Sequence, residues 1–332
     1  MNTKKSFIKF TKISFILFIL LAIFFASCKS AGQGGRQKTP QQACELYKYP
    51  DCFLWRIDGL AADGTPSRVY LLGTYHAGDD RGIEFPKCVL EALEESDRFV
   101  GELSTPEFNS LSRLSQSKML QSLLTDLSHT LIDELSQEEI MLLTQYVDSQ
   151  YLAQLVCFEP WVLNISLQSV LQDAAGLDTN KAYDLMVMDY IEKYKDNRGY
   201  EGLDENAQFQ IDLIAWGDWD IQMAMLRDTI EYLKDIDQAA NEMKELYELF
   251  LLGDEPAFTE LYYSDFEKDM DESPFYKDYY KQLLTDRNEK WAVKIADYLK
   301  EPGTTFVFAG SAHFTGPDSV FAFMRSNGDL LY

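Results

Sequence analysis

Histidine and cysteine are scarce in this chain. Its 332 residues include three histidines and five cysteines. No two cysteines are spaced as Cys-x-x-Cys, which argues against a thiolate metal cluster. No serine or cysteine stands in a nucleophile-elbow context, which argues against covalent catalysis of that kind. Function must therefore be sought elsewhere, and the few histidines are the first place to look.

Positive charge is also scarce. Lysine and arginine total 30 against 54 aspartates and glutamates, so the formal net charge is −24. Such a chain repels phosphate backbones, and we expect no nucleic-acid partner. Hydrophobic residues make up 46% and aromatics 14% of the chain, which excludes a disordered profile and allows one large domain or two modest ones.

Long apolar runs are missing except at the start, where residues 13–25 are apolar apart from Ser14. This run follows four lysines and is too short for a comfortable transmembrane helix, so residues 1–27 are predicted to be a signal peptide. The next residues, Phe25-Ala26-Ser27-Cys28, resemble a bacterial lipobox with Phe25 in place of leucine. We expect lipid on Cys28, which would anchor an exported protein at the bacterial outer membrane or cell surface. Plain secretion is the alternative.

A polar, glycine-containing stretch follows, and residues 28–48 are interpreted as the lipidated cysteine with a flexible tether. The folded domain is expected at 49–332. Four further cysteines are Cys44, Cys52, Cys88 and Cys157. In an oxidising compartment they could form two disulfides in any of three connectivities, or remain buried thiols.

One pattern occurs at both ends of the chain. Residues 69–76 (VYLLGTYH) and 306–313 (FVFAGSAH) each read as a buried strand that runs into Gly-x-x-His. Ligands of open α/β sheets bind outside the carboxyl ends of strands, where His76 and His313 would lie. Imidazole is the commonest metal ligand and also titrates near neutral pH. The repeated pattern predicts one shared site, although either histidine alone could be a hydrogen-bonded structural residue.

The remaining chain predicts a strand at 53–57, a helix from Pro86 to about 96, and a strand at 98–103 that contains Glu102. A carboxylate inside a buried strand is costly unless it is paired or binds a cation, so Glu102 is a candidate for the histidine site. Residues 110–270 read as a helical insert, in which His129 is expected on the surface. One helix is expected at 275–300.

In order, the segments Phe53-Leu54-Trp55, Gly73-Thr74-Tyr75-His76, Gly101-Glu102-Leu103, Asp286-Arg287-Asn288 and 309–316 (AGSAHFTG) resemble the TraB/GumN family, which includes the Tiki proteins. The resemblance implies an α/β (α+β) fold with kinship to erythromycin esterase and ChaN. The central sheet would come from the two strand-Gly-x-x-His ends, with a large helical middle region. There are two secondary site candidates. Asp204 ends the segment Gly202-Leu203-Asp204, where bacterial members have Gly-Leu-Glu, and Asp184 lies in Tyr183-Asp184-Leu185, which resembles another family position.

The resemblance implies a surface-anchored, divalent-metal-dependent hydrolase that acts on a peptide or protein. His76 and His313 would hold Mn, Co or Zn, and Glu102 would either complete the ligand set or accept a proton from a metal-bound water, whose pKa the metal would lower. Arg287 would face the developing oxyanion or a substrate carboxylate. The alternatives are a non-catalytic lipoprotein that sequesters a pheromone-like peptide and, with less support, a haem or iron carrier.

Overall fold

Strands from both ends of the chain interleave in one sheet, in the order β1-β2-β3-β6-β4-β5. The sequence predicts that strands from both ends form one sheet, and the structure confirms this. The mixed α/β class with a large helical region is also confirmed. The computed structural model describes residues 43–124, 126–196 and 199–331. The predicted signal peptide and Cys28 lie outside the described residues.

The centre of the sheet is parallel and buried. β3 (Pro66–Thr74) pairs in parallel with β6 (Gly303–Gly310), and β6 pairs in parallel with β4 (Arg98–Gly101). β5 (Glu201–Gly202) adds two residues beside β4. Parallel strands covered on both faces carry continuous apolar runs, which explains why the segments before both Gly-x-x-His units lack alternation.

The outer strands on the other side run antiparallel. β1 (Leu46–Lys48) pairs with β2 (Leu54–Leu60), and β2 pairs with β3, to which it is connected by a turn that contains Gly64. Gly64 has a φ of 84°, a conformation that favours glycine. The strand predicted at 53–57 is thus confirmed with a longer C-terminal end.

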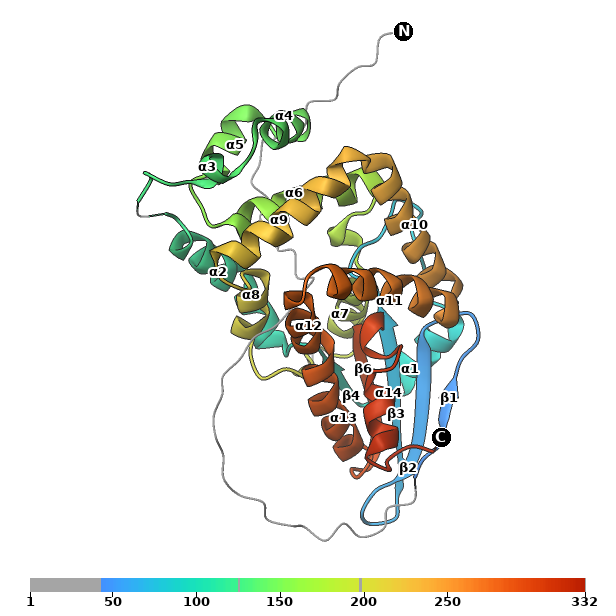
Figure 1. Cartoon of the computed structure of the whole chain (residues 1–332). Helices are drawn as coiled ribbons and strands as arrows, with labels where there is room; N and C mark the ends of the chain where they lie inside the picture. Colours follow the sequence, from blue (N-terminus) through green and yellow to red (C-terminus); the bar gives the residue numbers. More distant parts are fainter. Residues whose placement is uncertain (1–42, 125, 197–198, 332) are drawn as a thin grey trace.

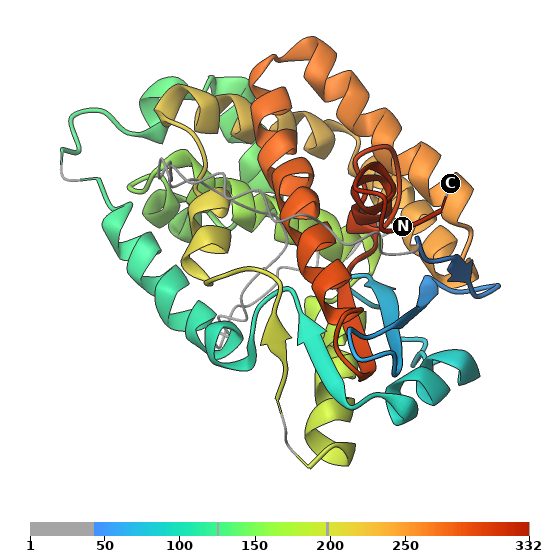
Figure 2. The same cartoon turned by 90° about the horizontal axis from the view of Figure 1, so that it is seen from below.

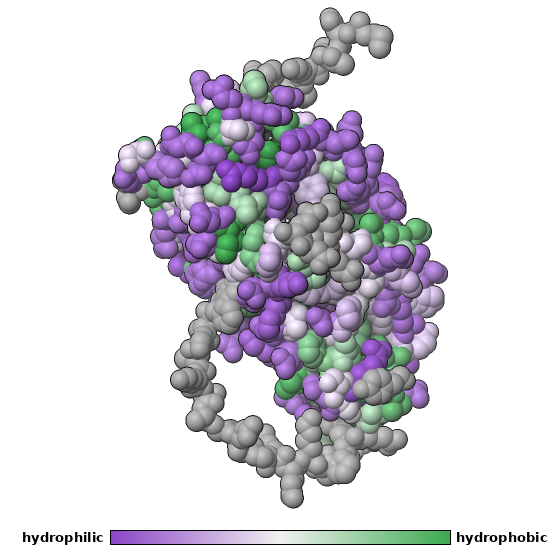
Figure 3. All heavy atoms as spheres, viewed as in Figure 1, coloured by the Kyte–Doolittle hydropathy of each residue, from purple (hydrophilic) through white to green (hydrophobic). Residues whose placement is uncertain are grey.

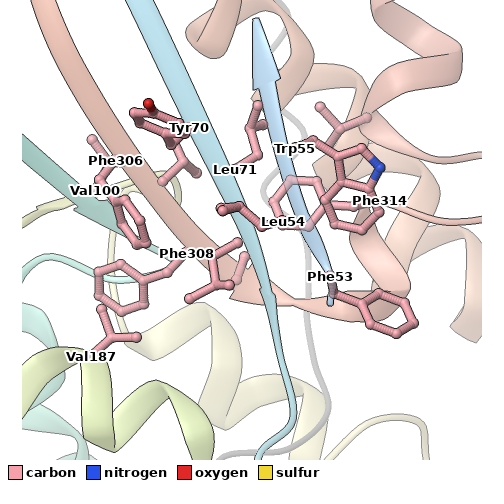
Figure 4. Packing of buried hydrophobic residues seen from close by; sticks show 14 of the residues in the cluster. Phe53, Leu54, Trp55, Tyr70, Leu71, Val100, Val187, Phe306, Phe308 and Phe314 are labelled. Carbon is pink, nitrogen blue, oxygen red and sulfur yellow. The ribbon is translucent and has the colours of Figure 1, made fainter. Parts of the chain in front are cut away.

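Helices cover both faces of the sheet. Figures 1 and 2 show α1 (Lys87–Glu95) and α7 (Tyr183–Tyr194) on one face, with α13 (Asp286–Tyr298) and α14 (Val320–Ser326) on the other. Figure 4 shows Phe308 directed toward Val187 of α7, whereas Trp55 packs against Phe314 with ring centroids 5.8 Å apart. The sheet therefore contributes large side chains to both layers, Phe308 from β6 and Trp55 from β2.

The predicted insert forms a helical region beyond one edge of the sheet, with a hydrophobic core of its own (Figure 1). β5 and α7 lie inside this span and pack on the sheet, which the expectation of a purely helical insert missed. The other helices are α2 (Thr105–Gln121), α3 (Leu131–Glu134), α4 (Gln137–Tyr146), α5 (Ser149–Leu155), α6 (Pro160–Ala175), α8 (Gln208–Ile214), α9 (Trp219–Lys234), α10 (Ile236–Leu252) and α11 (Glu255–Glu272).

The helix predicted at 275–300 is not one regular α-helix. α12 (Phe275–Tyr280) is followed by the π-helical turn η2 (Lys281–Thr285), and α13 begins at Asp286. A π-helical turn changes the angular position of the residues after it, and such turns are frequent at functional sites. The apolar spacing alone could not show this interruption, which lies just before Arg287.

Figure 3 shows a mainly hydrophilic face, with small hydrophobic patches at the end where α3, α4 and α5 lie. The side chain of His129 is 58% exposed and contacts Glu134, so its expected surface position is confirmed. Among the described residues, no helix combines the length and apolar character that crossing a membrane requires.

Candidate functional site

The two Gly-x-x-His units lie side by side. In the parallel pairing of β3 with β6, Gly73 is opposite Ala309 and Thr74 is opposite Gly310. Both units therefore leave the sheet at its carboxyl edge, one against the other. The expectation that a shared pattern would bring the two histidines to one place is confirmed.

The glycines of the two units are needed for close approach. A Cβ atom at Gly310 would lie 2.8 Å from His76 Nε2, and one at Gly73 would lie 2.8 Å from Ser311 Oγ. Real Cβ atoms essentially never come so close to another heavy atom. Neither glycine is among those with positive φ, so each leaves room for the other unit rather than allowing an unusual backbone angle.

His76 lies between two carboxylates. Its Nδ1 is 3.2 Å from Asp184 Oδ1, near the start of α7, and its Nε2 is 3.6 Å from Glu102 Oε1. A carboxylate accepts hydrogen bonds, so Nδ1 carries the proton and Nε2 presents a lone pair in the neutral form. Burial lowers the pKa of His76, but Asp184 and then Glu102 favour the charged ring, and the net effect raises this pKa above its ordinary value.

Glu102 is the first residue after β4 and not a residue within the strand, as its position in 98–103 had suggested. Oε1 accepts the Gly310 backbone N–H at 2.9 Å, and Oε2 accepts Arg287 Nη2 at 2.6 Å. Burial alone raises the pKa of Glu102, yet Arg287 and then the two histidines lower it far below its ordinary value. The carboxylate therefore stays ionised and is a weak base.

Arg287 is buried, and its N–H groups are taken up by the protein. Nη2 also donates to Asp204 Oδ2 at 2.8 Å, and Nη1 donates to His313 Nε2 at 3.0 Å. Longer contacts of 3.4 Å join Nε to Asp204 and Nη1 to the Leu283 carbonyl of the π-helical turn. Because these contacts use the guanidinium donors, Arg287 holds two carboxylates and a histidine instead of directing a free N–H into the cavity.

His313 differs from His76 in every contact. Its Nδ1 lies 2.6 Å from Asn288 Oδ1, and the Asn288 amide nitrogen donates to the Asp318 carbonyl. With Nδ1–H donating and Nε2 accepting from Arg287, the ring is satisfied in its neutral form. Burial and then the Arg287 charge lower the pKa of His313 well below its ordinary value. The Trp291 ring packs against this ring at a tilt of 40°, with centroids 4.3 Å apart.

A cavity of about 350 Å³ opens at this edge of the sheet. His76 and Glu102 line it on the side of the sheet, and their side chains are 19% and 16% exposed. The opposite walls come from the helical region and are mostly apolar; they include Leu171, Met243, Leu246, Phe258 and Leu283. The site thus joins a polar floor to a hydrophobic recess, which is the usual build of a small-molecule or peptide-side-chain pocket.

The expected metal site can be tested against these contacts. His76 Nε2 and Glu102 Oε1 are spaced as two ligands of one ion, each about 2.1 Å from it, would be. His313 Nε2, however, accepts an N–H from Arg287 and has no lone pair left. Among the described residues, no group of three or more His, Cys, Asp or Glu is arranged to hold a metal ion. In this arrangement His76, Glu102 and His313 cannot together bind one ion. The metal therefore stays a prediction, and no step of the proposed reaction is assigned to it.

All six residues singled out in the sequence meet here. His76 and Asp184 form one contact chain, while Glu102, Arg287, Asp204 and His313 form another that reaches His76 through Glu102. The sequence did not assign roles to Asn288 and Trp291. Trp291 carries Arg287 on its face at 4.4 Å and donates its indole N–H to Asp204 at 2.9 Å. The spacing of four residues between Arg287 and Trp291 on a helix was an available signal, whereas the adjacent position of Asn288 carried none.

Two comparisons relate the chain to known proteins, and a third found no match. A model of the TraB/PrgY/gumN family matches residues 53–329. A protein of Treponema pallidum (strain Nichols), described as an uncharacterized protein, is 26% identical over 319 residues, which cover 94% of this chain and 90% of that protein. No solved structure matches this chain.

Proposed function

Because the chain belongs to the TraB/PrgY/gumN family and both of its Gly-x-x-His units end at one cavity, we propose that it is a hydrolase of peptides. The observation that carries the proposal is the state of His76. Its Nδ1 is held by Asp184 while Nε2 lies at the cavity floor, which is the arrangement of a positioned general base.

In the proposed reaction, His76 Nε2 takes a proton from water as the water oxygen bonds to the carbonyl carbon of the substrate. The carbonyl π electrons move to its oxygen. The proton on Nε2 passes to the leaving nitrogen as those electrons return to the carbonyl and the C–N bond breaks. Asp184 keeps the imidazole in the tautomer that frees Nε2, as a carboxylate does in a serine-protease triad.

Glu102 supports this reaction through its charge. Its pKa is too low for it to be an effective base near neutral pH, because Arg287 and both histidines favour its ionised form. With Glu102 Oε1 3.6 Å from Nε2, two fixed carboxylates flank the imidazolium that forms when water loses its proton. Preorganised charge of this kind lowers the barrier because it needs no rearrangement during the step.

Arg287 is proposed to be a positioning residue. Its contacts hold Glu102 ionised beside His76 and keep His313 neutral beneath the cavity. The expected direct contact with an oxyanion would require one of these contacts to break. The apolar walls of the cavity suit a peptide, because an apolar side chain next to the scissile bond would be buried there. The walls include Leu171, Leu246, Met243 and Phe258.

We also propose export and anchoring through lipid on Cys28, as the N-terminal sequence predicts. Metabolic labelling with a radioactive or clickable fatty acid tests this. The label should appear on the wild-type chain and disappear from Cys28→Ser. Equal labelling of both chains would contradict the proposal.

The test of hydrolysis uses the purified mature chain and a peptide library read by mass spectrometry. Parallel samples contain a chelator, Mn, Co or Zn, and the variants are His76→Ala and the surface control His129→Ala. The proposal predicts new peptide termini with wild type and His129→Ala and none with His76→Ala. Cleavage that persists in His76→Ala would contradict it. Cleavage only with an added ion, together with its loss in His313→Ala, would support the three-ligand metal site.

A non-catalytic peptide binder is the second candidate, and the saturated contacts of Arg287 and His313 favour it because they leave His76 as the one open histidine of the pair. Isothermal titration separates the two candidates. Micromolar or tighter binding by wild type, with no cleavage under any metal condition, would establish the binder and remove the hydrolase.

A further inference from the structure

Two thiols are in contact beneath the sheet, at a place that the proposed chemistry does not use. Cys52 Sγ and Cys88 Sγ are 3.5 Å apart. Cys52 lies in the turn that leads into β2, and Cys88 is the second residue of α1. The pair therefore joins two elements that are 36 residues apart along the chain.

The other two described cysteines are directed elsewhere. Cys44 Sγ is 3.6 Å from the position of a Cβ on Gly59, near the far end of β2. Gly59 is seven residues beyond Cys52, which corresponds to roughly 20 Å along an extended strand. Cys157 Sγ faces the Ala153 carbonyl in the helical region. Of the three connectivities that four cysteines allow, only one joins Cys52 to Cys88, and the positions favour that bond.

The surroundings of the pair favour a cross-link over a reactive single thiol. Cys52 is 7% exposed and belongs to the main hydrophobic core, whereas Cys88 is half-buried at the edge of that core. Burial, followed by the contact with Cys88, raises the pKa of Cys52 to about 12. Because the thiolate is the attacking form, reaction with an outside partner would begin at Cys88 and not at Cys52.

We propose that Cys52 and Cys88 form a disulfide when the protein meets a disulfide donor such as oxidised glutathione. The Cys88 thiolate attacks one donor sulfur, and one donor thiol leaves. Cys52 loses its proton as its sulfur attacks Cys88 Sγ, and the second donor thiol leaves. The protein dithiol is thus oxidised to a disulfide while one donor disulfide is reduced to two thiols.

The cross-link lies close to the residues that position the cavity histidine. Tyr183, which precedes Asp184 at the start of α7, belongs to the same core cluster as the two cysteines. Burial, and then the nearby Cys52 and Cys88, raise the pKa of Tyr183, and its backbone N–H donates to the Tyr75 carbonyl, one residue before His76. The disulfide would hold the turn before β2 and the start of α1 together, next to the hydrogen bond between Tyr183 and Tyr75.

The experiment uses the folded mature chain with all cysteines present. The chain is incubated with oxidised or reduced glutathione, its remaining thiols are blocked with a maleimide, and its proteolytic peptides are mapped by mass spectrometry. The proposal predicts a linked peptide pair containing Cys52 and Cys88 only after oxidation. Because the bond closes a loop of this length, the melting temperature should rise by roughly 5 to 10 °C.

Three variants complete the test. Cys52→Ser and Cys88→Ser should each lose the linked peptide and the rise in melting temperature, and Cys157→Ser should keep both. Maleimide on both Cys52 and Cys88 after oxidation, or a link from either of them to Cys44 or Cys157, would overturn the proposal. The result does not depend on hydrolysis, since no peptide substrate is used.

Discussion

The two Gly-x-x-His units share a pattern and a sheet edge but present two different histidines. His76 keeps one nitrogen at the cavity floor and is flanked by Asp184 and Glu102. His313 has both nitrogens engaged, by Asn288 and Arg287, and is 4% exposed. The pKa of the first is raised and that of the second is lowered. A repeated motif therefore fixes where an imidazole lies, while partners outside the motif decide its protonation and its role.

The strongest test of this difference removes the open histidine. His76→Ala should lower kcat/KM for the cleaved peptide by about 10²- to 10⁴-fold, because it deletes the general base. Its thermal stability should stay close to that of wild type at a pH above the raised pKa of His76, where the ring is neutral and no ion pair is lost. His129→Ala is the matched control and should keep full activity. Equal activity of His76→Ala and wild type would assign both histidines the same structural role.

The buried cation should matter most for stability. Arg287→Met leaves Glu102 and Asp204 as buried carboxylates without their shared partner, so the free energy of unfolding should fall by about 3–5 kcal/mol. Arg227→Met is the control, because Arg227 is 45% exposed and its pairing with Glu139 contributes at most about 1 kcal/mol. Urea unfolding monitored by circular dichroism measures both. A loss of under 1 kcal/mol in Arg287→Met would show that this charge is dispensable.

The two glycines sharpen the comparison further. Gly310→Ala would place a methyl group on His76 Nε2, so the movable ring should shift and activity should fall by about 10²-fold, since displacements near 1 Å have such effects. Gly73→Ala would instead press on the Ser311 backbone and the Phe53 Cβ, so its main effect should be on the free energy of unfolding. Activity and urea unfolding are measured for both variants. Equal losses of activity and of unfolding free energy in Gly310→Ala and Gly73→Ala would contradict these different roles.

Loss of the Asp184 charge should move the pH dependence. In the proposed reaction neutral His76 is the base, so activity should fall as the pH drops through its raised pKa. Asp184→Asn removes the charge that favours the imidazolium, and the acid limb should move down by roughly 1 to 3 pH units. The ion pair stabilises the fold below the unfolded pKa of His76 and loses this effect as the pH rises through the folded one. If the acid limb of Asp184→Asn lies at the same pH as that of wild type, a group other than His76 titrates there.

Much of the fold could be predicted because it depends on local patterns. The apolar runs before His76 and His313 predicted buried strands, and the two ends do form one sheet. The short strand β5 and the π-helical turn were missed. The two residues of β5 are too few to show a period. The apolar residues around the π-helical turn keep a spacing typical of a helix, so the turn gives no signal of its own.

The candidate site was predictable as a set of residues and not as a set of contacts. Asp184 pairs with a histidine 108 residues away, and Arg287 reaches Glu102 across 185 residues. The motif spacing contains no information on such distant partners. This is why the sequence suggested equivalent metal-ligating histidines, whereas the contacts distinguish an open base from a neutral, buried ring.

The most direct test follows the imidazole signals of the folded protein by NMR as the pH is varied. Three histidines give at most three Cε1–H signals, which can be assigned with single substitutions of His76, His129 and His313. The account predicts that His76 titrates above about 6.5 and that His313 stays neutral until the protein unfolds in acid. Titration of His313 at or above the pH at which His76 titrates would contradict it.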